Sequence, residues 1–429
     1  MRIHLKALGC RLNEAELDTW SRDFTARGHR MTGDPAEADL VVINTCAVTE
    51  EAVRKSRQLV RRAHRTNPAA KLVMSGCYAS LDPEQAAAEL GVDLVVANPD
   101  KDRLVAIASE ALHLPTMPAI AAEPGEQALL AKSRQRAFIK VQDGCRYRCT
   151  YCIVTLARGE ERSRPIAEIV AEINQLHTSG IQEVVLTGVH LGGYGSDNGS
   201  DLHALVSAVL ADTDIPRLRL GSLEPWDLPP DLWGQFANPR FMPHLHLPMQ
   251  SGADAVLRRM ARRCKSGEFA QMLDAAHSTV PDLNVTTDII VGFPGETDDE
   301  WAQTLDFVER MGFGHLHIFA FSPRAGTKAA GLADPVPREI KRRRSEQLHA
   351  LGARLKRRML EGFVGREFEV LVEGAPQQDD AGRRLWSGYT PNFLRVAIAS
   401  NADLENRLLQ VRCDAVSTDG ELLHGTPLA

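Results

Sequence analysis

The chain has 429 residues, 44% of them hydrophobic and 25% charged, and a formal net charge of −6. This length predicts about three domains, and the composition is that of a soluble globular protein. No apolar run approaches the length of a membrane span, and the net acidic charge gives no overall sign of a nucleic-acid partner. We therefore expect a cytoplasmic protein.

The first hundred residues alternate short apolar strands with helical patterns. The strands are predicted at residues 2–8, 39–44, 71–76 and 93–97. Asn13 and Glu16 are predicted to cap the first helix. Such alternation is typical of a parallel sheet with helices on its faces, so the expected fold class is a doubly wound α/β sheet.

Three cysteines mark one edge of this predicted sheet. Cys10, Cys46 and Cys77 each stand just beyond the carboxyl end of one of the first three strands. In an open α/β sheet this edge is where ligands bind. Three unrelated buried cysteines are the alternative, since free cysteine is among the most buried residue types. Their matching positions favour a shared cluster.

Residues 114–133 are rich in Pro and Ala and are predicted to be a linker. A second β/α series follows, with helices predicted at 165–180 and 201–212. Its strands are predicted at 137–141, 183–188, 217–222, 244–249, 284–293 and 315–321. Six such units predict a partial barrel rather than a complete eightfold one, with sites at the carboxyl rim of the strands.

The last hundred residues change character. A long basic helix is predicted from about residue 338 to near Gly362. The segments after it alternate polar and apolar residues between Gly, Asn and Asp turns. They predict a small all-β domain, closed or nearly closed as a barrel.

The loop DGCRYRCTYC, residues 143–152, holds Cys145, Cys149 and Cys152. Three thiolates can bind three irons of a four-iron, four-sulfur cluster and leave the fourth iron open. Zinc completed by a distant residue is the alternative, although zinc normally takes four protein ligands. Tyr151 offers an aromatic face beside the cluster.

Other cysteines and histidines are predicted to be structural. Cys264 and Cys413 stand outside the two groups of three and are expected to be packing residues. The pairs His244 with His246 and His315 with His317 alternate along two predicted strands. The members of each pair therefore share a face of a strand, which places them in the barrel interior as satisfied histidines rather than metal ligands.

The spacing Cys145-x3-Cys149-x2-Cys152 resembles the signature of the radical S-adenosylmethionine superfamily. The resemblance implies that the open iron binds S-adenosylmethionine and that one electron cleaves it to a 5′-deoxyadenosyl radical. It also implies a set of cofactor-binding residues. These are Tyr151, Gly188 near the methionine amino group, Ser222 and Glu224 near the ribose and sulfonium, and Gly292 in the strand that frames the adenine. Turn chemistry alone is the alternative explanation of such glycine-containing strand ends.

The whole chain is similar to one branch of that superfamily, the methylthiotransferases. The similarity rests on the contexts of the six cysteines and on segments 247–260 and 321–330. Family members usually have Pro where this chain has Thr155 and Tyr where it has Cys264. The resemblance implies a cluster domain at 1–113, a linker at 114–133, a radical core at 134–362 and an RNA-binding TRAM barrel at 363–429.

The implied cofactors are two [4Fe-4S] clusters and S-adenosyl-L-methionine. The N-terminal cluster would carry an added sulfur atom that one S-adenosylmethionine methylates, and a second S-adenosylmethionine would yield the radical that removes hydrogen from an unactivated carbon. Sulfur transfer to that carbon completes the implied reaction. No catalytic acid or base from the protein is expected, because the cofactors supply the chemistry.

The segments around Cys46 and at 316–327 most resemble the branch that acts on N6-threonylcarbamoyladenosine at position 37 of tRNA. The alternatives are N6-isopentenyladenosine in tRNA and an aspartate of a ribosomal protein. A redox-sensing iron–sulfur protein that binds RNA is the non-enzymatic alternative. The implied partners are the tRNA anticodon stem-loop, a sulfur donor, and an electron donor of the flavodoxin or ferredoxin type.

Two kinds of residue are candidates for contact with RNA. Tyr389, Phe393 and Arg395 in the tail are predicted to bind it by aromatic stacking and phosphate contact. The alternative for Phe393 is a place inside the small barrel. Four basic segments are predicted to be solvated helix faces, some of which also suit a phosphate-binding surface, namely 54–65, 258–265, 341–344 and 354–359.

Overall fold

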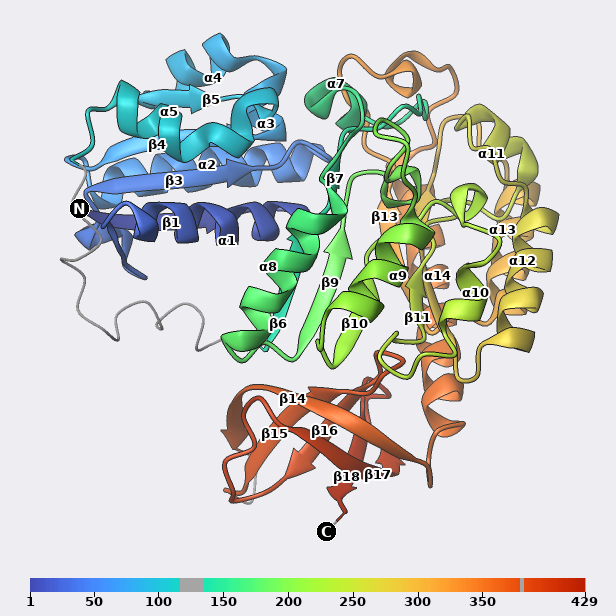
Figure 1. Ribbon diagram of the computed structural model, residues 1–429. Coiled ribbons are helices and arrows are strands. Elements are labelled where there is room, and N and C mark those ends of the chain that lie inside the picture. Colours follow the sequence, from blue (N-terminus) through green and yellow to red (C-terminus); the bar gives the residue numbers. More distant parts are fainter. Residues whose placement is uncertain (116–134, 379–381, 429) are drawn as a thin grey trace.

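The computed structural model describes residues 1–115, 135–378 and 382–428. Figure 1 shows an N-terminal sheet with its helices, a larger central unit of strands and helices, and a small barrel below it. The predicted linker at 114–133 lies almost entirely outside the described residues. Among the described helices, none is long and apolar enough to cross a bilayer.

The N-terminal unit is a five-stranded parallel sheet in the order β2-β1-β3-β4-β5. Its strands are β1 (Arg2–Ala7), β2 (Arg30–Met31), β3 (Leu40–Thr45), β4 (Lys71–Gly76) and β5 (Leu94–Val96). Apolar side chains attach α1 (Arg11–Ala26) and α5 (Leu104–Ala111) to one face, and α2 (Glu50–Thr66) and α4 (Pro83–Leu90) to the other. Both faces of the sheet are therefore covered, which confirms the doubly wound class.

The predicted cap of the first helix was wrong. α1 begins at Arg11 with Cys10 in the cap position, and no side chain caps it. Asn13 and Glu16 lie instead on the buried face of the helix, 1% and 3% exposed. A spacing of three residues suits a cap, but it also places two side chains on one helix face, and here burial decides between the two.

The central unit contains six parallel strands in two sheets, β10-β9-β6 and β11-β12-β13. Bridges from Leu218 to Phe241 and from Ser222 to His246 join the sheets into one curved wall. The strands are β6 (Arg136–Lys140), β9 (Glu183–Thr187), β10 (Arg217–Leu220), β11 (His244–His246), β12 (Asn284–Val291) and β13 (His315–Ala320). This arrangement confirms the predicted partial barrel.

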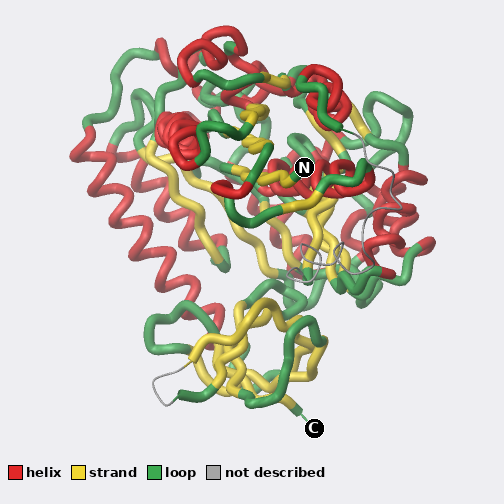
Figure 2. Tube along the Cα trace, turned by 90° about the vertical axis from the view of Figure 1, so that its left-hand side faces the viewer, coloured by secondary structure: helices red, strands yellow, loops and turns green. Residues whose placement is uncertain are grey.

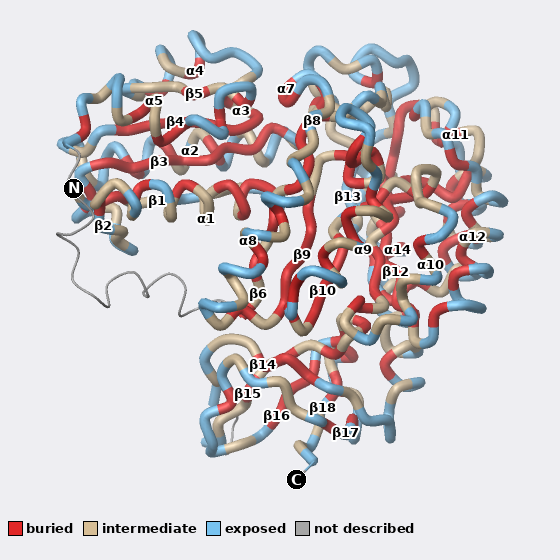
Figure 3. Tube along the Cα trace, in the orientation of Figure 1, coloured by how far each residue is buried: buried red, intermediate tan, exposed pale blue. Residues whose placement is uncertain are grey.

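Helices cover the outside of this wall and bury its apolar side chains in the largest core of the described chain. They are α8 (Ile166–Thr178), α9 (Leu202–Asp212), α10 (Leu232–Gln235), α11 (Asp254–Arg259), α12 (Ser266–Thr279), α13 (Asp298–Met311) and α14 (Arg338–Glu361). Figure 3 shows the strands mostly buried and the outer faces of the helices exposed. Cys264 belongs to this core and is 6% exposed, which confirms it as a packing residue.

Short elements frame the two cysteine groups. α3 (Cys77–Leu81) begins at the third N-terminal cysteine. β7 (Gln142–Asp143), α7 (Val154–Arg158) and β8 (Arg162–Ser163) frame the loop with the other three. Short 3-10 helices are η1 (Pro35–Glu37), η2 (Asn98–Arg103), η4 (Leu191–Gly193), η5 (Pro225–Asp227) and η6 (Lys328–Gly331).

The C-terminal unit is a closed barrel in the order β14-β15-β16-β18-β17, visible as a ring of strands in Figure 2. Its strands are β14 (Glu367–Gln378), β15 (Arg384–Tyr389), β16 (Arg395–Ala399), β17 (Leu408–Val416) and β18 (Leu423–Pro427). Cys413 is fully buried in its core, as predicted. The loop after β15 docks against β10 and β12 of the central unit. Carbonyls of residues 389–392 accept hydrogen bonds there from Arg217, Arg219 and Asn284.

Candidate functional site

The three N-terminal cysteines converge at one edge of the sheet. They follow β1, β3 and β4, which are neighbouring strands. A Cβ atom on Gly9 would lie 2.7 Å from the sulfur of Cys46, so the backbone beside Cys10 closely approaches the second cysteine. The thiols of Cys10, Cys46 and Cys77 are also close enough to affect one another electrostatically. The shared rim expected from the sequence is therefore present.

Arg158 connects this rim to the central unit. Its guanidinium donates to Glu16 Oε1 at 3.0 Å, to Asp143 Oδ1 at 3.0 Å and to Asn13 Oδ1 at 2.9 Å. The Arg158 side chain is 1% exposed. It is the last residue of α7, which starts two residues after Cys152. One buried side chain therefore connects the loop that carries the second cysteine trio to α1, the helix that follows the first cysteine of the N-terminal trio.

Two lysines complete this buried charge network. Lys101 Nζ lies 2.5 Å from Glu16 Oε2, and Lys140 Nζ lies 3.0 Å from Asp143 Oδ2. Burial alone would raise the pKa of Glu16, but the charges of Arg158, Lys101 and Lys140 lower it to about 2. Both carboxylates are therefore ionised. Asp102 also pairs with Lys140 at 2.7 Å, so three cations face three carboxylates, and Arg158 is the cation of this network nearest the cysteines.

The N-terminal trio fits a [4Fe-4S] cluster bound through three thiolates. Burial raises the pKa of Cys46 to about 11, so that thiol is neutral unless a metal or a cation stabilises the thiolate. Arg158 lies near the thiols of Cys10 and Cys77, and Asn98 Nδ2 lies 3.9 Å from Cys77 Sγ. Positive charge and N–H donors around converging thiols stabilise an anionic cluster.

The second trio is held by a tight loop. Cys145, Cys149 and Cys152 are partly buried between β7 and α7. Gly144 has a φ of +74°, and a Cβ atom there would lie 1.8 Å from the carbonyl oxygen of Glu160, so only glycine fits. Burial raises the pKa of Cys145 to about 12 and of Cys152 to about 11. These thiols also fit a cluster, because ligation by iron would hold them as thiolates.

Arg262 supplies the cation beside this second trio. Its guanidinium lies 4.0 Å from Cys149 Sγ, 2.9 Å from Glu224 Oε2 and 4.2 Å from the centroid of the Trp226 ring. It also donates to the carbonyl of Pro248. Since only 2% of the Arg262 side chain is exposed, it is a fixed positive group that ties the ends of β10 and β11 to the cysteine loop.

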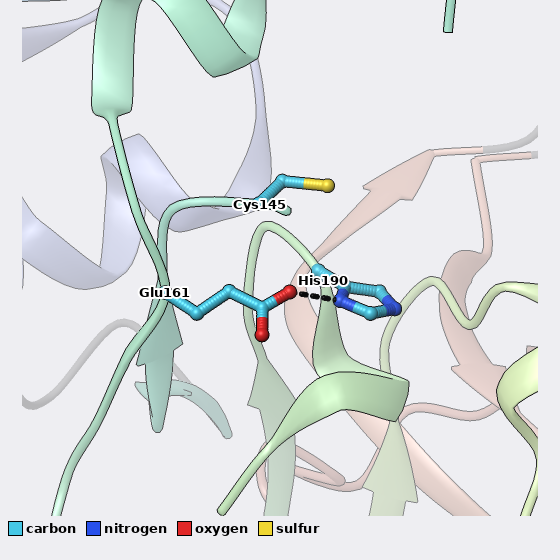
Figure 4. A group of neighbouring side chains, drawn as sticks. All are labelled: Cys145, Glu161 and His190. Carbon is cyan, nitrogen blue, oxygen red and sulfur yellow. Dashed lines mark hydrogen bonds and ion pairs between the residues drawn. The ribbon is translucent and has the colours of Figure 1, made fainter. Parts of the chain in front are cut away.

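A histidine beside Cys145 is held between two acids, of which Figure 4 shows Glu161. His190 Nδ1 lies 2.5 Å from Glu161 Oε1, and His190 Nε2 lies 2.7 Å from Asp227 Oδ2. Burial alone would lower the pKa of His190, but the two carboxylates raise it. Both ring nitrogens are therefore occupied as donors, and His190 supports the loop without being free to bind a metal.

The predicted cofactor residues lie around this loop. Tyr151 packs against the apolar cluster that contains Phe293, at the end of β12. Glu224 carries the ion pair with the buried arginine described above. Ser222 is exposed and pairs by its backbone with His246. Contact of these residues with S-adenosylmethionine stays a prediction.

The two predicted cofactor glycines have local packing reasons of their own. A Cβ atom on Gly188 would lie 2.9 Å from Gln142 Oε1. Gly292 has a φ of +74° and donates its N–H to Glu296 Oε2 at 2.9 Å, and a Cβ atom there would lie 2.2 Å from Lys341 Cγ. Their roles at the cofactor remain predictions beside these packing constraints.

The predicted RNA-binding residues share one groove between the three units. Tyr389 stacks on Phe393 with ring centroids 4.7 Å apart, and the Arg136 guanidinium lies 5.1 and 4.8 Å from these two rings. With Arg395 they line a groove of about 630 Å³ that β1, α1 and β6 also border. Phe393 is absent from the apolar core of the small barrel. RNA binding by these residues stays a prediction.

A second groove, of about 380 Å³, lies between α2 and the loop after β13. Four arginines dominate its lining, which comprises Glu50, Val53, Arg54, Arg57, Gln58, Arg61 and Arg324. The basic segment 54–65 thus presents one face to solvent, as predicted. The same prediction was wrong at Arg262 and at Arg344, each a buried residue in an ion pair within the central unit.

Sequence reasoning did not identify Arg158, Lys101 or Arg262 as part of the site. Arg158 and Arg262 stand in basic stretches that contain several other arginines. Nothing in the spacing separates the buried member from its exposed neighbours. The available signal was proximity in the chain, since Arg158 follows the cysteine loop directly.

Comparison with known proteins agrees with this geometry. Residues 2–97 match the family described as "Uncharacterized protein family UPF0004", and residues 139–308 match the radical SAM superfamily. Among solved structures, the radical S-adenosylmethionine methyltransferase TsrM from Kitasatospora setae superposes with a TM-score of 0.57 at 16% identity, covering 77% of each chain. That likeness concerns the fold alone.

Curated relatives cover nearly the whole chain. Threonylcarbamoyladenosine tRNA methylthiotransferase MtaB from Thermotoga maritima is 36% identical, over 97% of this chain and 95% of its own length. MtaB from Bacillus subtilis is 33% identical, over 96% and 93%. The tRNA-2-methylthio-N(6)-dimethylallyladenosine synthase of Akkermansia muciniphila is 32% identical, over 99% and 98%. The chain therefore belongs to the radical SAM tRNA methylthiotransferase family and is an enzyme.

Proposed function

We propose that this protein methylthiolates N6-threonylcarbamoyladenosine at position 37 of tRNA, in the anticodon stem-loop, to give the 2-methylthio derivative. The observation that carries the proposal is the pair of cysteine trios joined by α7. The names of relatives support this substrate, because the MtaB proteins of Thermotoga maritima and Bacillus subtilis are named for threonylcarbamoyladenosine. The enzymes named for dimethylallyladenosine are similar to this chain to almost the same degree, so the substrate needs a direct test.

The closeness of the two trios supports their action on one substrate. Ala157 of α7 packs in one apolar cluster with Cys77 and Ala47, while α7 itself begins two residues after Cys152. Asn98 Nδ2 donates to the carbonyl of Ala157 at 2.7 Å, which fixes this contact. A five-residue helix therefore separates the two groups of thiols.

The cofactors of this family are two [4Fe-4S] clusters and S-adenosylmethionine, and when bound they supply the radical and the methylthio group. The chain would hold one cluster through Cys10, Cys46 and Cys77. It would hold the other through the remaining trio of the loop, Cys145, Cys149 and Cys152. The protein's own contribution is binding, charge and exclusion of water. Arg158 and Arg262 place fixed positive charge against the two trios.

The same arrangement offers surfaces for tRNA. The grooves beside Arg395 and along α2 are lined by arginine, and guanidinium groups bind phosphate oxygens. Both grooves border the N-terminal unit, so a nucleic acid lying in them would span more than one part of the protein. A sulfur donor, and an electron donor of the flavodoxin or ferredoxin type, belong to this proposal, as does a cytoplasmic location.

The test is mass spectrometry of tRNA nucleosides from cells with the gene, without it, and complemented with the Cys149→Ala variant. We expect 2-methylthio-N6-threonylcarbamoyladenosine to vanish in the deletion strain and to return only with the unaltered gene. Loss of the isopentenyl derivative instead would assign the other tRNA branch. If the reduced, oxygen-free protein released no 5′-deoxyadenosine from S-adenosylmethionine, a non-catalytic redox-sensing role would replace the proposal.

A further inference from the structure

Three polar side chains that belong to neither cysteine trio meet on the inner wall of the central unit. They are His246 on β11, Asp288 on β12 and His317 on β13, and their ligand atoms all lie within 4.8 Å of one another. His246 Nε2 lies 3.1 Å from Asp288 Oδ1, and the rings of His246 and His317 meet edge to face with centroids 5.2 Å apart. We name these three residues the histidine cluster.

The histidine cluster faces the open interior of the wall. Along β13, His315 and His317 are exposed while Leu316 between them is buried in the core that includes Leu348 and Leu351 of α14. Alternation along the strand therefore points His317 away from the helices. His246 and Asp288 keep 18% and 22% of their side chains exposed, so solvent reaches all three members.

The cluster lies just below the second cysteine trio. His246 and Pro248 are two residues apart on the same chain segment, which separates them by about 7 Å at the rise of a strand. The carbonyl of Pro248 accepts a hydrogen bond from Arg262, whose guanidinium lies 4.0 Å from Cys149 Sγ. A base whose reacting carbon lies at the cysteine loop would thus bring its substituents within reach of the cluster.

The cluster is only partly satisfied. His246 Nδ1 pairs with Thr286 Oγ1 at 2.9 Å, and its other nitrogen pairs with Asp288. No described residue forms a hydrogen bond with the His317 ring, whose aromatic contacts within the described chain are with His246 and His315. His317 thus has a free donor and a free acceptor, and Asp288 keeps free lone pairs. Because both nitrogens of His246 are occupied, the set is better suited to a polar organic group than to a metal ion.

Arginine side chains lie lower on the same wall. There Arg136, Arg217 and Arg219 face the carboxylates of Glu183 and Glu373. Counted together with Asp288 of the histidine cluster, three cations face three carboxylates, so these groups exert no net attraction on an anion. Recognition at the histidine cluster therefore depends on hydrogen bonds and not on net charge.

We propose that the histidine cluster binds the threonylcarbamoyl group of the substrate base and thereby selects it over an isopentenyl group. This proposal rests on the proposed function. The threonylcarbamoyl group carries a carboxylate, a hydroxyl and urea N–H groups, which match the imidazole of His317 and the carboxylate of Asp288. An isopentenyl group has no polar atom and would leave these groups unpaired, which is the strongest known basis for rejecting a substrate analogue.

The test compares anticodon stem-loops that differ only at position 37, which carries adenosine, N6-threonylcarbamoyladenosine or N6-isopentenyladenosine. Their dissociation constants are measured at one salt concentration with the reconstituted holoenzyme and with its His317→Phe variant. We expect the preference for threonylcarbamoyladenosine over adenosine to fall by about tenfold to a hundredfold in the variant, as for loss of a hydrogen bond to a charged group. Affinity for the adenosine stem-loop should stay unchanged, which also reports an intact fold.

Two further variants sharpen this comparison. His317→Asn keeps a donor and an acceptor and should retain part of the preference. His349→Phe makes the same exchange on the exposed face of α14 and should retain all of it.

A His317→Phe enzyme with an unaltered preference would overturn the proposal, provided the wild type modifies threonylcarbamoyladenosine. A wild type that modifies only the isopentenyl stem-loop would instead refute the proposed function. The wild type could also hold one divalent metal ion per chain in addition to the iron of its iron–sulfur clusters. If His317→Phe lost that ion, the histidine cluster would be a metal site and the proposal would be overturned.

Discussion

At the scale of single residues, Arg158 holds the two cysteine sites together. Its partners Glu16 and Asp143 are themselves buried and ionised, with Glu16 titrating at about 2 because burial is outweighed by three nearby cations. A buried ion pair is weak evidence for stability as a whole, but removing one partner leaves an uncompensated buried charge. Substitution of Arg158 should therefore destabilise the fold strongly.

Replacing Arg158 with Met should lower the free energy of unfolding by about 3–5 kcal/mol, measured by denaturant titration. The same variant should bind fewer than about eight irons per chain after anaerobic reconstitution, because the N-terminal trio loses its main cation. Arg162→Met is the matched control. The Arg162 side chain is 44% exposed, and its guanidinium lies 3.9 Å from Asp143 Oδ2, which is a weaker contact than that of Arg158. Full stability and full iron content in Arg158→Met would show that this network does not support the trio.

Site residues could be predicted from the sequence where they are close together along the chain and their spacing is typical of one kind of site. Cys145, Cys149 and Cys152 could be identified because one loop must surround one cluster. Glu16 and Arg158 could not be paired, because they are 142 positions apart and no periodicity connects them. The same distance explains why Asn13 and Glu16 were assigned to a cap instead of a buried network.

At the scale of elements, β9 contributes a buried carboxylate that binds three arginines. Glu183 lies 2.9–3.0 Å from Arg136, Arg217 and Arg219, and its own side chain is fully buried. Burial alone would raise the pKa of Glu183, but the three guanidinium groups lower it to about 2. Because this pKa is below the ordinary value of 4.5, the stabilisation is present above pH 4.5 and is lost as pH falls toward 2.

The Glu183→Gln variant should be less stable than the wild type by about 3–5 kcal/mol at neutral pH. The difference in unfolding free energy should shrink as pH falls from 4.5 toward 2, because the wild-type carboxylate then becomes protonated. Denaturant titrations across this range give the measurement. Glu168→Gln on the exposed face of α8 serves as control and should change stability by less than about 0.5 kcal/mol. A gap between Glu183→Gln and the wild type that does not depend on pH would refute the assignment.

The basic face of α2 permits a test with two adjacent residues. Arg61 lines the groove beside Arg324, whereas Arg62 is exposed outside that lining. If the groove binds a phosphate, Arg61→Ala should weaken tRNA binding and lower the slope of log affinity against log salt by about one. Arg62→Ala should leave the slope unchanged. Equal effects of the two substitutions would mean that α2 attracts tRNA only through its overall charge.

Most elements could be predicted because apolar runs and helical periods are local properties. β18 was missed, since its five residues include Gly425 and Pro427 and it becomes a strand only by pairing with β16 and β17. The cap of α1 was misplaced because contacts from outside the helix bury Asn13 and Glu16, and no local pattern shows those contacts. Local patterns identify an element, whereas its exact limits depend on its neighbours.

At the scale of the whole molecule, the order of β–α units predicted both the doubly wound sheet and the partial barrel. The way in which these parts dock could not be predicted. The docking contacts are single side chains on carbonyls, such as Asn284 Nδ2 on the carbonyl of Asn392 at 2.8 Å and Asn98 Nδ2 on the carbonyl of Ala157 at 2.7 Å. Such contacts carry no pattern along the chain. The Asn98 contact and the Arg158 network hold the two cysteine trios together, whereas the Asn284 contact docks the small barrel.

This arrangement predicts that loss of either trio has a distinct effect. Cys149→Ala should abolish release of 5′-deoxyadenosine from S-adenosylmethionine, because we propose that this trio holds the cluster whose open iron binds the cofactor. Cys46→Ala should keep this release while forming no methylthio product on tRNA. Each variant should hold about four irons per chain instead of about eight, since each retains one four-iron cluster. Methylthio product from Cys46→Ala, or loss of cofactor cleavage in that variant with four irons still bound, would contradict the division of roles between the two sites.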